Sequence, residues 1–116
     1  MADTGKIIAL IKALGGSGEG GGGGMTPVPV EGSTPSITAE ANKLYLCGEV
    51  STLSITPPES GIFGVIFESG STPTVLTLDS DIIVPDWFDS TSLEADTIYE
   101  LNVNENLLTV GMWGAS

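Results

Sequence analysis

The stretch Thr97-Ile-Tyr-Glu-Leu-Asn-Val-Asn-Glu-Asn-Leu-Leu-Thr-Val-Gly-Met112 decides the fold class of this chain. Its first half alternates apolar and polar residues, the period of a strand with one buried face, and the apolar positions are Tyr99, Leu101 and Val103. The cluster Asn104-Glu105-Asn106 is a turn signal, after which the alternation resumes at Leu108, Val110 and Met112. The stretch therefore predicts a β-hairpin.

Short apolar runs separated by turn residues fill the chain between residue 44 and this hairpin. They lie at Leu44–Val50, Leu53–Ile55, Ile62–Phe67, Thr74–Leu78 and Ile82–Val84. Turn signals recur about every ten residues, which is the cadence of a sandwich or a barrel, and no helical period follows residue 35. The sequence predicts a mainly β protein with six to eight antiparallel strands, as a small antiparallel β-sandwich or barrel-like domain over residues 36–116.

Residues 1–15 predict a short α-helix that precedes this domain. Its apolar residues fall at the three-and-four spacing of one helical face, and they are Ile7, Leu10, Ile11 and Leu14. A helix of about ten residues is marginal by itself in water. We therefore expect these four side chains to dock on a partner, as an anchor.

Residues 16–35 predict a flexible linker rich in glycine and proline. Gly16–Gly24 reads GSGEGGGGG, and three prolines follow before the β domain begins. A tether of this composition transmits no packing between its two ends. The β domain should consequently keep its core without the helix.

Charge narrows the range of functions. The net charge is −12, the only cations are Lys6, Lys12 and Lys43, and eleven acidic residues follow Lys43. Such a chain repels phosphate backbones and anionic lipid surfaces, so we expect neither nucleic acid nor a membrane as partner. The acidity itself favours solubility, with attraction to a basic partner as the alternative.

The residue types needed for nucleophilic catalysis are missing. The chain has no histidine and no arginine, so no base stands ready for its serines and threonines. Cys47 is the single cysteine and lies among apolar neighbours, which predicts a buried structural thiol. We expect no enzyme activity and no cofactor.

Two groups between residues 79 and 96 are candidate binding residues. Six acids crowd there, at Asp79, Asp81, Asp86, Asp89, Glu94 and Asp96, but they lack the spacing of a calcium loop or of a defined carboxylate pair, so no metal is expected. Trp87 and Phe88 form either an aromatic platform for a sugar or protein, or a cap on the core or a subunit interface. Trp113 carries the same two alternatives.

The apolar run Ile7–Leu14 is too short to span a bilayer and is interrupted by Lys12, with no cleavage site after it. The sequence accordingly predicts a soluble protein made in a cytoplasm.

Four segments carry a resemblance to a known family: Gly61–Gly70, Ser71–Leu78, Pro85–Phe88 and Thr97–Val103. Together, over roughly residues 40–113, they resemble the β modules of tailed-phage fibre proteins, of head-fibre or decoration, tail-fibre or baseplate type. The resemblance implies a homotrimeric virion structural protein, made in the host cytoplasm, with residues 1–15 attached to the capsid or to other virion proteins. It carries over no functional residue.

Three functions remain open at this point. The first is a capsid-attached head fibre or decoration protein that displays its β domain outward. The second is a tail-fibre or baseplate protein that binds a glycan or protein on the host surface. The third is a free carbohydrate-binding module.

Overall fold

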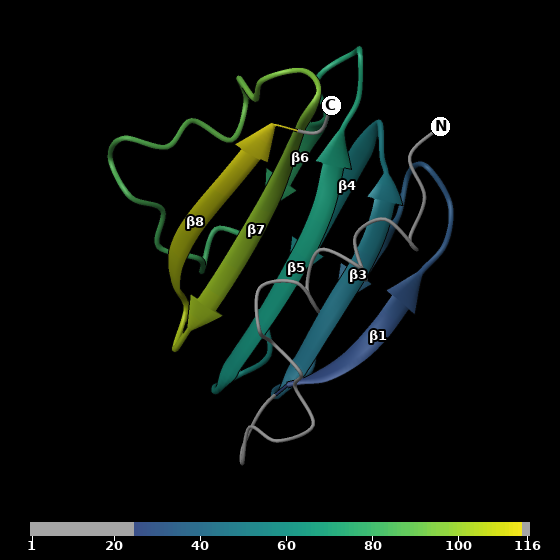
Figure 1. Cartoon of the computed structure of the whole chain (residues 1–116). Coiled ribbons are helices and arrows are strands. Elements are labelled where there is room, and N and C mark those ends of the chain that lie inside the picture. Colours follow the sequence, from purple (N-terminus) through teal and green to yellow (C-terminus); the bar gives the residue numbers. More distant parts are fainter. Residues whose placement is uncertain (1–24, 115–116) are drawn as a thin grey trace.

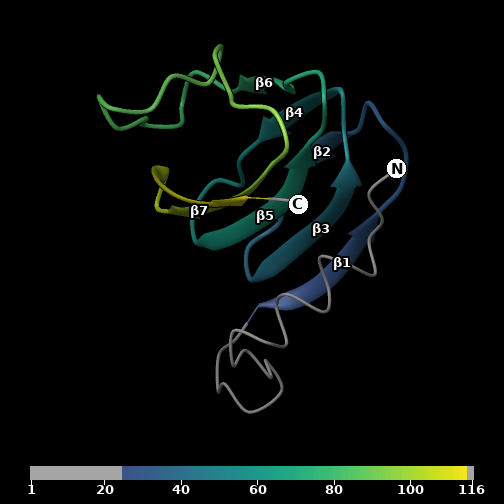
Figure 2. The ribbon, with the colours of Figure 1, turned by 45° about the horizontal axis from the view of Figure 1, so that its top comes forward.

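The computed structural model describes residues 25–114 of the chain. They form eight strands in two sheets that face each other across one core (Figures 1 and 2). The larger sheet has five strands in the order β1-β3-β5-β7-β8, and the smaller has three in the order β2-β4-β6. The mainly β character is as predicted. The predicted anchor helix and residues 16–24 of the predicted linker lie outside the described residues.

The first six strands alternate between the two sheets as a parallel coil. The strands of the larger sheet are β1 (Thr26–Val30), β3 (Lys43–Glu49) and β5 (Ile62–Ser69), and those of the smaller are β2 (Ser36–Thr38), β4 (Thr52–Thr56) and β6 (Val75–Leu78). Within each sheet these neighbours pair in parallel. Each parallel crossover therefore runs through the opposite sheet.

The predicted hairpin is confirmed, and it ends the coil. It consists of β7 (Thr97–Asn104) and β8 (Leu107–Gly114), which pair antiparallel, and β7 also pairs antiparallel with β5. The two turn residues have positive φ, 51° at Glu105 and 69° at Asn106. Such a turn matches the right-handed twist of the flanking strands.

The prediction of antiparallel strands throughout is wrong, because only the hairpin and its contact with β5 are antiparallel. The physical reason lies in the apolar content of the strands. β3 and β5 bury side chains of both parities, as strands of parallel sheets do when both faces are covered. The sheet also begins earlier than residue 36, because β1 lies within the segment predicted as linker.

The core lies between the two sheets. The larger sheet contributes alternate residues of β3, β5 and β7, with the aromatic rings of Phe63, Phe67 and Tyr99 fully buried, and the smaller sheet contributes Ile37, Leu53, Ile55 and Leu76. The connection between β6 and β7, residues 79–96, supplies the apolar cover that the three-stranded sheet lacks, through Ile82, Phe88 and Leu93. This connection lies beside the hairpin (Figure 2).

The edge strand β1 carries two prolines whose placement blocks further pairing. The Thr26 N–H donates to the Asn42 carbonyl at 2.8 Å, so alternate residues of β1 turn their backbone toward β3. Pro27 and Pro29 have the opposite parity and present no N–H at the outer edge. The edge is thereby a poor template for another strand.

Candidate functional site

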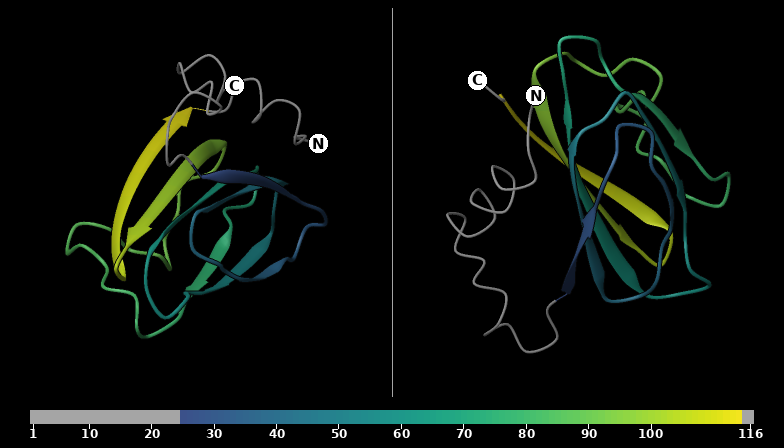
Figure 3. Two further views of the ribbon diagram at one scale, coloured as in Figure 1. Left: turned by 90° about the horizontal axis from the view of Figure 1, so that it is seen from below. Right: turned by 90° about the vertical axis from the view of Figure 1, so that its right-hand side faces the viewer.

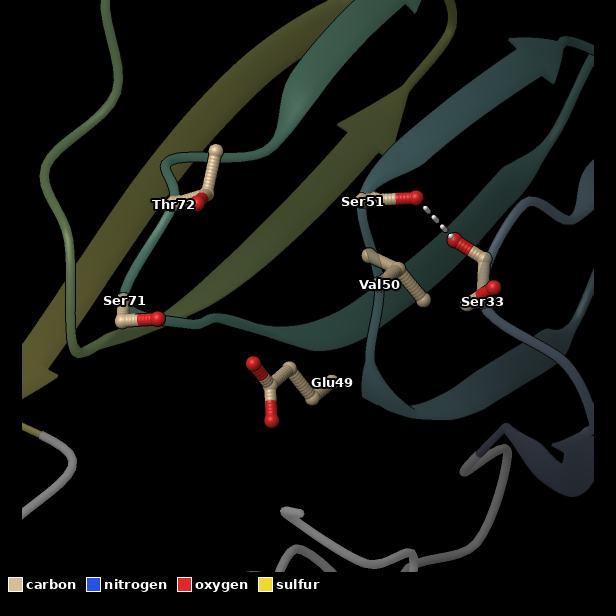
Figure 4. A pocket seen from close by; sticks show the side chains of 6 residues that line it. All are labelled: Ser33, Glu49, Val50, Ser51, Ser71 and Thr72. Atoms are coloured by element: carbon tan, nitrogen blue, oxygen red, sulfur yellow. Dashed lines mark hydrogen bonds between the residues drawn. The ribbon is translucent and has the colours of Figure 1, made fainter.

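The turns of the coil stack on one another and form the floor of a shallow hollow. It is lined by Ser33, Glu49, Val50, Ser51, Ser71 and Thr72, which come from three successive turns of the coil (Figure 4). Its volume of about 250 Å³ is smaller than the roughly 300–1,000 Å³ of most small-molecule sites.

Hydroxyl groups in and beside this hollow hold the turns together. The Ser51 N–H and Oγ both donate to the Ser33 carbonyl, at 2.7 Å and 3.1 Å. One turn further, the buried Thr74 Oγ1 donates to the Val50 carbonyl at 2.6 Å, and the Thr74 N–H donates to Ser69 Oγ at 3.0 Å. The Ser51 and Thr74 hydroxyls thus link successive turns of the coil, whereas the Ser69 hydroxyl bonds within one turn. No histidine or lysine lines the hollow to activate them.

The Glu49 side chain lies directly over Gly70. A Cβ atom at Gly70 would collide with the Glu49 carboxylate, so a larger residue there would require the Glu49 side chain to move. Glu49 is also the register partner of Glu68 in β5. Two carboxylates thus lie at the same end of the larger sheet, where the strands of the coil finish.

A second hollow lies beside the hairpin, at the predicted aromatic pair. It is lined by Trp87, Phe88, Asp89, Ser92, Leu93, Glu94, Tyr99 and Met112, with a volume of about 270 Å³. The rings of Trp87 and Phe88 contact each other edge-on, with centroids 5.7 Å apart, but they differ in burial. Trp87 is 64% exposed, whereas Phe88 is 8% exposed and packs edge-on to Tyr99 with ring centroids 6.4 Å apart. Phe88 therefore caps the core, and Trp87 alone is available as a platform.

Backbone hydrogen bonds brace the loop that carries Trp87. The Phe88 N–H donates to the Pro85 carbonyl at 3.1 Å, and the Glu94 N–H donates to the Tyr99 hydroxyl at 2.7 Å. Asp89 Oδ1 accepts from both the side chain and the backbone N–H of Thr91, and these bonds lower the pKa of the Asp89 carboxyl. The loop presents Trp87 next to carboxylates, which suits the hydroxyls of a sugar or a polar partner.

Sequence reasoning missed that several apolar side chains along the hairpin are exposed. Met112 is 42% exposed on the rim of this hollow. Toward the other end of β8, Ile83 and Leu107 bridge to each other and are 60% and 52% exposed. The signal for Leu107 was present in the sequence, because only one of two consecutive leucines in a strand can face the core.

The six acids of this connection do not converge on one point. Asp79 accepts the Asp81 N–H at 2.9 Å, a turn-forming bond like that of Asp89. Within residues 25–114, no three histidine, cysteine or acidic side chains gather closely enough to hold a metal ion.

The prediction for Cys47 is confirmed. Its side chain is fully buried in the core, and burial raises the pKa of the thiol to about 12. A thiol in this setting remains protonated and unreactive at neutral pH. The predicted docking residues Ile7, Leu10, Ile11 and Leu14 lie outside the described residues.

In the part of the chain that the structure describes, no helix is long and apolar enough to cross a bilayer. Comparison of the chain with protein-family models, with curated proteins and with solved structures gives no match.

Proposed function

We propose that this chain is a non-catalytic structural protein of a phage virion, a capsid-attached head fibre or decoration protein that displays its β domain outward. The observation that carries the proposal is that the domain uses hydroxyl groups to bind one turn to the next. The display of Trp87 on a braced loop adds to it. The resemblance of residues 40–113 to tailed-phage fibre modules supports it. Attachment to the capsid or to other virion proteins is proposed through residues 1–15.

Copy number in purified particles tests this proposal. Quantitative mass spectrometry of virions should find the chain in many tens of copies if it decorates the head. A few copies per particle would instead assign it to the tail tip or baseplate. Absence of the chain from particles would overturn a virion function altogether.

We further propose that the protein assembles as a homotrimer. Support comes from the large apolar side chains exposed beside the hairpin, which are Ile83, Trp87, Leu107 and Met112. Exposed apolar groups of this kind gather at subunit interfaces. Light scattering should give three times the chain mass of 11.9 kDa at micromolar concentration. A stable monomer would contradict this.

A host-surface glycan is the second candidate partner, and the exposed Trp87 with the hollow beside it favours this function. Titration of soluble host polysaccharide should quench tryptophan emission in the wild type, and Trp87→Ala should abolish binding. Trp113→Phe is the matched control, because Trp113 lies on the opposite face of the larger sheet. Equal binding by Trp87→Ala and the wild type would exclude this site.

A further inference from the structure

The larger sheet carries a second apolar cluster on the face that points away from the core. We call it the outer cluster, and its members are Leu44, Leu46, Ile66, Ile98 and Trp113. The register places these residues side by side, because Leu46 pairs with Ile66 and Ile98 pairs with Trp113. Leu46, Ile66 and Ile98 are only 2–3% exposed, as core residues are.

No element of the described residues lies over this cluster. The smaller sheet and the connection at residues 79–96 both contribute to the core on the other side of the larger sheet, and no coloured segment lies on its outer side (Figure 3). Parallel strands that are apolar on both faces occur in sheets covered on both faces. The outer cluster therefore requires cover from outside residues 25–114.

We propose that residues 1–15 of the same chain form this cover, docked on the outer cluster as an amphipathic helix. Their apolar side chains are Ile7, Leu10, Ile11 and Leu14, about as many as the cluster itself offers. A helix of eleven residues is about 16 Å long. The outer cluster spans four neighbouring strands, from β3 to β8, which is about 15 Å at normal strand spacing.

The tether has the reach that this docking needs. Residue 25 immediately precedes β1, which lies next to β3 in the same sheet. Nine glycine-rich residues span on the order of 15–18 Å on average, and about 30 Å when fully extended. Residues 16–24 can thus return the helix from the edge of the sheet to its centre.

The carboxylates on the outer face of the larger sheet also favour residues 1–15 as its cover. Glu68 is the register partner of Ile98, Glu100 is the register partner of Ile66, and Glu49 lies beside Glu68. The only lysine in residues 25–114 is Lys43, at the opposite end of β3 from Glu49. On the helical wheel of the predicted helix, Lys6 lies at the border of the apolar face and Lys12 lies on the far side, so the long stem of Lys6 can reach carboxylates around the cluster.

Docking of residues 1–15 on the sheet does not depend on a virion function, but it competes with the proposed attachment of these residues to the capsid. Docking on the sheet and attachment to a particle would use the same four apolar side chains. The two states exclude each other, so a particle that binds residues 1–15 has to displace them from the sheet.

Trp113 provides the readout, because it belongs to the outer cluster. We choose a Trp87→Phe background, in which Trp113 is the only tryptophan of the full-length chain. Ile11→Asp places a charge in the apolar face of the predicted helix, and Trp113 emission should shift to longer wavelength and become several-fold more accessible to acrylamide. Leu10→Ala should give a smaller change in the same direction. The β domain is checked by far-ultraviolet circular dichroism.

Ala9→Asp is the matched control, because residue 9 lies opposite Ile7 and Ile11 on the helical wheel. It adds the same charge and should leave Trp113 emission unchanged. Unchanged emission in both Ile11→Asp and Leu10→Ala would overturn the proposal. A wild-type emission that shifts upon dilution, together with loss of oligomer, would also overturn it, because the cover would then come from a second copy.

Discussion

Two glycines with positive φ differ in the space that a side chain would find, so their alanine variants form a matched pair. Gly32 (φ 96°) and Gly61 (φ 104°) both adopt a conformation that other residues avoid. A Cβ at Gly32 meets no atom within 4 Å, whereas one at Gly61 would lie 2.7 Å from the Ala41 Cβ. Gly32→Ala should therefore lower the free energy of unfolding by the backbone cost alone, about 1–2 kcal/mol.

Gly61→Ala should cost at least about 1 kcal/mol more, because the added methyl group also requires the turn to move. Urea titrations of both variants measure the difference. Equal losses would mean that the turn around Ala41 yields freely.

The buried thiol gives a prediction at high pH. Burial raises the pKa of Cys47 to about 12, so the native protein keeps a proton that the unfolded chain loses near its ordinary value of about 8.5. The stabilisation is complete below about pH 8.5 and is lost progressively as the pH rises toward 12. Cys47→Ala should remove this part of the alkaline loss of stability.

The same residue should resist thiol reagents under native conditions. At pH 8, labelling in buffer should be at least about a hundredfold slower than in concentrated urea, because the native thiolate is scarce and enclosed. Rapid labelling of the folded protein would show that the core around Cys47 opens without unfolding.

At the scale of single elements, the prolines of β1 permit a test of edge protection. Pro29→Val supplies an N–H at the outer edge and should leave the fold intact while promoting self-association, measured as a rise in light scattering with concentration. Val28→Pro is the matched exchange. Residue 28 turns its backbone toward β3, so this proline removes a ladder bond and should cost about 3 kcal/mol. Similar effects of the two variants would mean that residues 28 and 29 do not turn their backbone groups to opposite sides of β1.

The hairpin could be predicted from sequence because its strands alternate clearly. Tyr99, Leu101 and Val103 face the core in the structure as the pattern indicates. The parallel coil could not be predicted in the same way. Its partners are seventeen to twenty-three residues apart, as in Thr26 with Lys43 and Thr52 with Val75, and each interval contains a strand of the other sheet. Turns then recur about every ten residues, as they do in an antiparallel meander.

For the candidate site, the sequence predicted the aromatic pair but not which of its two side chains is exposed. Trp87 and Phe88 are adjacent in a loop, where no periodicity tells which side chain points inward. The choice depends on Tyr99, against which Phe88 packs, and on the bonds that brace the loop. Both are contacts made by the folded chain.

For the whole molecule, the uncompensated acids predict how stability responds to acid. Between pH 7 and 5, protonation relieves repulsion among carboxylates, so the melting temperature should hold or rise. The contribution from the lowered pKa of Asp89 is fully present above its ordinary pKa of about 3.9 and is lost as the pH falls below that value. Thermal melts at half-unit steps of pH measure the curve. A steep loss above pH 5 would mean that carboxylates have specific native partners, such as a bound cation.

The reversal of direction in the hairpin determines where the described chain leaves the sheet. Gly114 pairs with Thr97, and Thr97 pairs with Ser69, at the end where β1, β3 and β5 finish, whereas residue 25 stands at the end where they begin. Eight strand residues separate these ends by about 25 Å. A fluorophore or enzyme fused behind the last residue would thus be held a strand's length from the tether, with the domain acting as a rigid spacer between cargo and support.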